Sequence, residues 1–154
     1  MSELNELYEK IWTSVLSGLK GKTPIFQDNK AIPKNWIYSG KSDGKYTMVL
    51  TQGRALVKLE FDKDIKEIND YAYYQLMEFK EKIESKFGNT LIWFIPEKNK
   101  ISNISFSKYG FDVEDEKSRE KMVDFLIDNV VKLELATWDA LVIVREKLTR
   151  KHFS

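Results

Sequence analysis

The sequence has no cysteine and only one histidine. Without cysteine the chain cannot form disulfides, thiolate metal sites or a thiol nucleophile, and this fits a reducing compartment. The histidine, His152, is in the last three residues, where we expect a frayed and solvated side chain. Zinc sites and histidine-based acid–base catalysis need rigid support around the imidazole, so we expect neither.

Long apolar runs are also missing. No stretch approaches the roughly 20 apolar residues that a membrane-spanning helix needs. The segment Met1–Glu6 is acidic and polar, whereas a secretion signal is basic and then apolar. We therefore expect a cytoplasmic protein without a membrane partner.

Net charge is nearly absent, but the two signs are separated along the chain. The formal net charge is +1, from 25 basic and 24 acidic residues. Between Gly18 and Lys58 there are eight basic residues and two acidic ones, whereas residues 59–96 and 112–134 are mainly acidic. This separation predicts a dipolar surface, which bears on binding partners rather than on the fold.

The N-terminal half predicts a helix followed by a β-meander. At 154 residues, 42% of them hydrophobic, the chain has the length of one ordinary domain, residues 1–154. Apolar residues at helical spacing predict a helix from Glu3 to Lys20. Three strands with turns between them follow, at Trp36–Tyr38, Lys45–Thr51 and Arg54–Phe61, the last with alternating apolar and polar residues.

The C-terminal half predicts a helix, two strands and a long helix. The first helix covers Asp70–Phe87, and the wholly apolar strand Thr90–Ile95 is expected to be central and covered on both faces. Strand Ser102–Ser107 precedes a helix from Glu114 to Lys147, about 50 Å long at 1.5 Å per residue. This helix either breaks near residues 136–137 or projects and packs on a second copy. The predicted fold class is α+β, in the order α-β-β-β-α-β-β-α, with helices packed on a mainly antiparallel sheet.

The meander interleaves aromatic and basic residues, the mixture that single-stranded nucleic acid requires for stacking and phosphate contacts. The plainer interpretation is that Trp36 and Tyr46 face the core and that the lysines are solvated. The candidate nucleic-acid-binding residues are Trp36, Tyr38, Lys41, Lys45, Arg54 and Lys58.

Other motifs do not predict catalysis. Gly21-Lys22-Thr23 and Gly40–Lys45 resemble phosphate-binding loops, but neither joins a strand to a helix, so both are interpreted as turns. A restriction-endonuclease-like nuclease would carry an acid-x-Lys pair on its third strand, whereas this chain has Lys58-Leu59-Glu60, the reverse order. We assign no catalytic residue, metal site or cofactor.

Four segments resemble an uncharacterised bacterial and archaeal domain-of-unknown-function family, which occurs alone or C-terminal to restriction-endonuclease-like nuclease domains. The sharpest element is Ile-Glu-x-x-Phe-Gly shortly before Leu-x-Trp. The segments are Trp36-Ile37, Ala55–Glu60, Phe79–Gly88 and Leu91–Trp93.

The resemblance covers about Leu7 to Leu148 and implies an association with DNA-processing or defence systems, without any catalytic residue to assign. One departure is Lys117–Glu120, which stands where the family usually carries a tryptophan.

The leading functional hypothesis is a non-enzymatic domain that binds nucleic acid, or a nucleic-acid-processing protein, through the basic meander. The first alternative is a protein–protein module or a homodimer formed through the long last helix. The second is a degenerate or active metal-dependent nuclease that uses Glu60, Lys58 and a nearby aspartate.

Overall fold

A computed structural model describes residues 1–151 of the chain. The expected frayed position of His152 lies outside the described residues. None of the helices in the described part combines the length and the apolar character of a membrane span.

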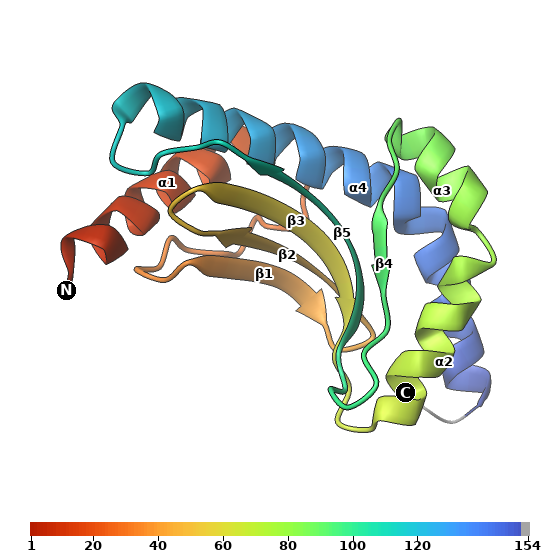
Figure 1. Cartoon of the computed structure of the whole chain (residues 1–154). Coiled ribbons are helices and arrows are strands. Elements are labelled where there is room, and N and C mark those ends of the chain that lie inside the picture. Colours follow the sequence, from red (N-terminus) through yellow and green to blue (C-terminus); the bar gives the residue numbers. More distant parts are fainter. Residues whose placement is uncertain (152–154) are drawn as a thin grey trace.

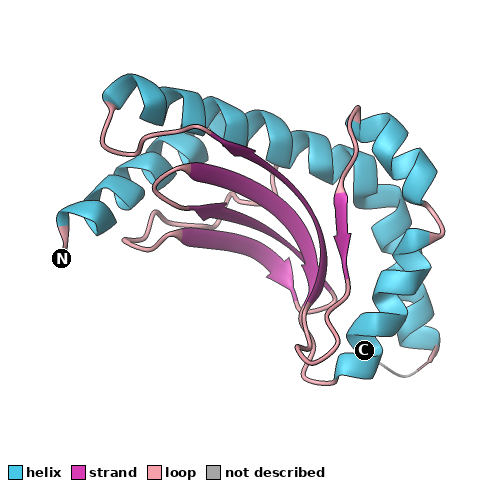
Figure 2. Cartoon of the chain, in the orientation of Figure 1, coloured by secondary structure: helices cyan, strands magenta, loops and turns pink. Residues whose placement is uncertain are grey.

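The described residues form one antiparallel sheet of five strands in the order β1-β2-β3-β5-β4 (Figure 2). The meander is confirmed, because β1, β2 and β3 are consecutive neighbours. The bounds are Trp36–Lys41 for β1, Gly44–Leu50 for β2, Arg54–Phe61 for β3, Ile92–Phe94 for β4 and Ser102–Tyr109 for β5.

The expected position of the fourth strand was wrong. β4 has three residues and lies at the edge of the sheet, whereas β5 takes the interior place between β3 and β4. Trp93 turns toward the helices, but Ile92 and Phe94 are 61% and 53% exposed on the other side. An unbroken apolar run therefore does not require that both faces are covered, since one face of β4 is apolar and open to solvent.

The helices of the described chain pack on one side of the sheet. Strand residues that point to this side, such as Val57, Leu59 and Ile104, are fully buried. Figure 1 shows that the strands curve and that α4 and α2 lie outside the curve. The bounds are Glu3–Leu19 for α1, Lys66–Met77 for α2, Lys80–Phe87 for α3 and Glu116–Arg150 for α4. The α+β class and the expected order are thus confirmed.

The predicted second helix is interrupted. Helical backbone stops after Met77 and resumes at Lys80, with Phe79 at φ −101° and ψ 10°. The interruption separates α2, whose Tyr73 ring contacts Trp93, from α3, whose Phe87 ring contacts Phe106. Because the sheet curves, two short helices can follow it where one straight helix would lose contact.

Helix α4 is continuous over 35 residues, so the first of the two alternatives, a break near residues 136–137, is absent. Its end does not project, since Leu141, Val144 and Leu148 are buried. Figure 1 shows that α4 first crosses the sheet and then turns down beside α2.

A buried hydroxyl pair ties α4 to the sheet. Thr137 Oγ1 donates to the Leu133 carbonyl at 2.6 Å, a bond that tends to bend helices. The same oxygen lies 2.7 Å from the Tyr46 hydroxyl of β2. Because Thr137 gives its one hydroxyl proton to Leu133, the Tyr46 hydroxyl is the donor of this bond. Burial raises the pKa of Tyr46 well above its usual value, which keeps the hydroxyl neutral.

We expect this pair to stabilise the fold measurably. Tyr46→Phe removes one buried hydrogen bond and should lower the free energy of unfolding by about 1 kcal/mol. Thr137→Val leaves the Tyr46 hydroxyl buried without its partner and should cost about 1–3 kcal/mol. In urea unfolding, the double variant should cost less than the sum of the single variants, because both remove the same bond.

The matched control is Thr13→Val, since Thr13 Oγ1 makes the same kind of bond to the Glu9 carbonyl at an exposed site in α1. We expect a change within about 0.5 kcal/mol there. An equal loss at Thr13 and Thr137 would mean that helix propensity, rather than the buried pair, explains the effect.

Candidate nucleic-acid interface

The side of the sheet turned away from the helices is here called the concave face, because it lies inside the curve of the strands (Figure 1). Alternate residues of each strand point to it. The strand register aligns Tyr38, Thr47, Lys58, Ser105 and Ile92 in one row across the sheet. No helix of residues 1–151 packs on this face.

The structure brings five of the six candidate residues onto the concave face. The exception is Lys41, which pairs with Gly44 at the end of the β1–β2 hairpin and falls on the opposite side by strand alternation. Tyr46 faces the core, as the plainer interpretation allowed, but Trp36 does not. The five residues on the concave face are Trp36, Tyr38, Lys45, Arg54 and Lys58.

The β1 rim of the concave face is aromatic and cationic. Trp36 and Tyr38 are 38% and 43% exposed, and their rings stack with centroids 5.9 Å apart at an interplanar angle of 24°. The Lys45 ammonium lies 4.4 Å from the Tyr38 ring centroid, and the Lys34 ammonium lies 5.1 Å from that of Trp36. Such contacts hold the rings in place, and a ligand base would displace a lysine or stack on the exposed part of a ring.

The opposite rim carries apolar residues that the candidate set omitted. Ile92 and Phe94 of β4 and Tyr109 of β5 are exposed there, Tyr109 at 70%. Arg54 Nη1 donates to the Tyr109 hydroxyl at 3.3 Å and its guanidinium lies 5.6 Å from the ring centroid. Tyr109 could have been predicted from the alternation of Ile104 with serines in β5. This alternation places the odd-numbered residues of the strand, Tyr109 included, on the solvated side.

The middle of the face is polar and internally paired. Glu60 is 5% exposed and accepts from Thr47 Oγ1 at 2.6 Å, while Lys58 Nζ lies 3.1 Å from its other oxygen. Lys45 pairs with Asp62 at 2.7 Å. Two of the cations are therefore partly neutralised, and Arg54 contributes the most available charge.

The same geometry bears on the nuclease alternative. Both Glu60 oxygens are engaged, one by Thr47 and one by Lys58, and these are the positions that a magnesium ion would occupy. Asp43, in the turn that precedes β2 in the chain, lies 3.7 Å from Arg145 Nε of α4. Within residues 1–151, no group of three acidic or histidine side chains is placed to hold a metal ion.

Comparison with known proteins gives a family and nothing finer. No curated protein and no solved structure matches the chain. A family model described as "Domain of unknown function (DUF4268)" matches residues 7–141, from the first helix into the last one. The expected resemblance to an uncharacterised domain family is confirmed at this level. The chain belongs to the DUF4268 family of domains of unknown function.

Proposed function

We propose that this domain binds single-stranded nucleic acid across the concave face. The observation that carries this function is the gathering of Trp36, Tyr38 and Tyr109 with Arg54 on one open face. Planar rings stack on bases, and cations contact phosphates. A duplex hides the base faces, so exposed rings favour an unpaired strand.

The dimensions of the face suit a short strand. The aromatic rings lie on β1 and β5, which are separated by three strand spacings of about 4.8 Å, or roughly 14 Å. A strand crossing the sheet would stack bases on Trp36 and Tyr38 at one rim and on Tyr109 at the other. Between the rims the path passes over a middle that is already paired, since Thr47 and Ser105 are buried and Thr47 donates to Glu60.

Stacking is expected to contribute more than charge. Lys45 and Lys58 each share a carboxylate, which reduces their attraction for phosphate. With about two effective phosphate contacts, the slope of log K against log salt should be about −1.4 for a single strand. A shallow slope follows from the ion pairs on this face.

The family resemblance implies a setting for this function, in DNA processing or defence. Neighbouring genes that encode nucleases or restriction enzymes would support that setting. The alternative is that the same face binds a partner protein instead of nucleic acid.

Two substitutions test the stacking rim. Trp36→Ala and Tyr38→Ala should each weaken binding of a labelled single-stranded oligonucleotide about 5- to 150-fold, because stacking contributes about 1–3 kcal/mol per base. Fluorescence anisotropy with DNA and RNA measures this. Tyr74→Ala, an exposed tyrosine on α2, is the matched control and should leave affinity unchanged. Equal effects at Tyr38 and Tyr74, or no binding by the unmodified protein, would reject the function.

A comparison of Arg54 with Lys41 tests whether phosphates contact the concave face or the surface beside it. Arg54→Ala should make the salt slope shallower by about 0.7, because one phosphate contact is lost. Lys41→Ala removes an equal charge beside the face and should leave the slope as it is. Binding titrations over a series of salt concentrations measure both slopes. A larger change of slope for Lys41→Ala than for Arg54→Ala would mean that the phosphates do not lie on the concave face.

The homodimer through the last helix stays a prediction. The observation that favours a dimer is an exposed apolar stripe on one surface of α4, formed by Leu135, Trp138 and Val142. Sedimentation equilibrium over a dilution series tests it. A dimer should dissociate toward the 18.1 kDa monomer mass on dilution, whereas a monomer at every concentration contradicts the dimer.

A further inference from the structure

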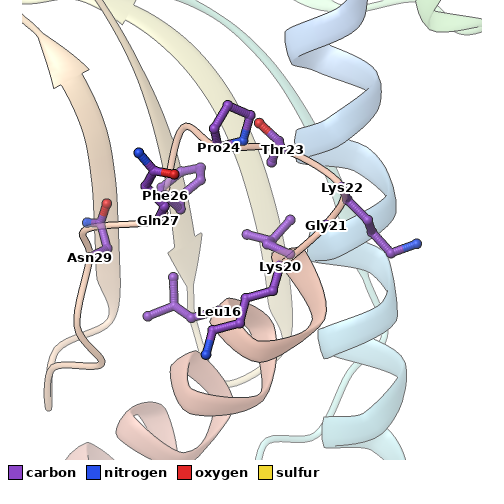
Figure 3. A pocket seen from close by; sticks show the side chains of 10 residues that line it. Leu16, Lys20, Gly21, Lys22, Thr23, Pro24, Phe26, Gln27 and Asn29 are labelled. Carbon is purple, nitrogen blue, oxygen red and sulfur yellow. The ribbon is translucent and has the colours of Figure 1, made fainter.

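The loop that follows α1 borders a half-open hollow of about 450 Å³ (Figure 3). The chain reverses at Gly21, whose φ of 80° lies in the left-handed region that favours glycine. It then runs back beside β1, and the hollow lies between this loop and the last turns of α1. The volume falls within the usual range of small-molecule sites.

The loop is held in place, so the hollow is preformed. Asn29 Nδ2 donates to the Tyr38 carbonyl at 2.8 Å, and Ser39 Oγ donates to the Ile25 carbonyl. The Ile25 amide in turn donates to Thr23 Oγ1 at 3.2 Å. Phe26 is 3% exposed and anchors the middle of the loop in the core. These contacts also cover the outer edge of β1, which would otherwise present unpaired backbone groups.

The lining combines apolar walls with a few polar groups. Leu16, Pro24 and Phe26 supply apolar surface, and Gln27 supplies an amide that both donates and accepts. Figure 3 shows Lys20 extending past Leu16 along the hollow, whereas Lys22 points away toward α4.

Lys20 is a more available cation than the lysines of the concave face. Within residues 1–151, Lys45 and Lys58 have carboxylate partners but Lys20 forms no ion pair. Two carbonyls at the end of α1 are already occupied, because Leu19 accepts from the amides of Lys22 and Thr23 and Ser17 accepts from the amide of Lys20. The negative end of the helix is thereby partly satisfied, which lessens its repulsion of an anion.

We propose that this hollow binds one nucleotide, with the base against Leu16, Pro24 and Phe26 and the phosphate beside Lys20. The Gln27 amide hydrogen-bonds the edge of the base. The choice of a nucleotide rests on the proposed function. The hollow adjoins the stacking rim, since Asn29 lines it and bonds the backbone of Tyr38. The nucleotide is either free or the end of a strand that leaves the concave face over β1.

Neighbouring lysines provide the test. Calorimetric titration with AMP, CMP, GMP and UMP should show saturable binding by the full chain. Lys20→Ala should weaken it about tenfold, the effect of losing a hydrogen bond to a charged group. Lys22→Ala is the matched control and should change little. Gln27→Ala should weaken binding of a nucleoside as well, whereas Lys20→Ala should not.

Several outcomes would overturn the nucleotide site. They are no binding at millimolar nucleotide, equal losses for Lys20→Ala and Lys22→Ala, or inorganic phosphate that competes as well as the nucleotides do. Failure here is distinguishable from failure of the concave face, because Trp36→Ala should weaken oligonucleotide but not mononucleotide binding. If Lys20→Ala also weakens the oligonucleotide, the site takes the end of the strand; if not, it takes a free nucleotide.

Discussion

The helices pack on one side of the sheet, and the rest of the structure depends on this constraint. Val57, Leu59 and Ile104 are buried because the helices cover them, and the residues between them in each strand turn to the concave face. Burial of apolar area is the main favourable term in folding, so the covered side is apolar. The concave face is freed from that requirement and carries polar, charged and aromatic side chains beside a few aliphatic ones such as Ile92.

Curvature of the sheet accounts for the shapes of the helices. The interruption between α2 and α3 and the turn of α4 both keep helix surface against a curved support. The bond between Tyr46 and Thr137 lies in the interior, where a neutral hydroxyl pair satisfies both groups without the cost of burying a charge. Sheet and helices therefore also meet at polar points, and Ser102 of β5 makes a second one by donating to the Asn69 carbonyl of α2.

The concave face has a division of roles among its residues. The rims carry exposed rings, and the middle carries carboxylates that lie against lysines, such as Glu60 against Lys58. Burying Glu60 without partners would be costly, so its contacts with Thr47 and Lys58 are a condition for placing a carboxylate there. The same contacts reduce the positive charge of the face, which is why stacking takes the larger part in the proposed binding. The hollow beside α1 has the opposite character, with one available lysine and apolar walls.

Local pattern by itself determined the α+β class, helix α1, the three strands of the meander and the alternation that places Tyr38 and Lys58 on one side. These features depend on residues close in the chain, whose spacing sets which face they share. The position of β4 at the edge, the bend of α4 and the pairing of Lys58 with Glu60 were decided only by tertiary structure. An apolar run such as Leu91–Trp93 has the same pattern at the centre and at the edge of a sheet. The partner of a side chain depends on strands that are brought together from distant parts of the sequence. Tyr109 joins Arg54 on the concave face for that reason, because β5 pairs with β3 only in the folded chain.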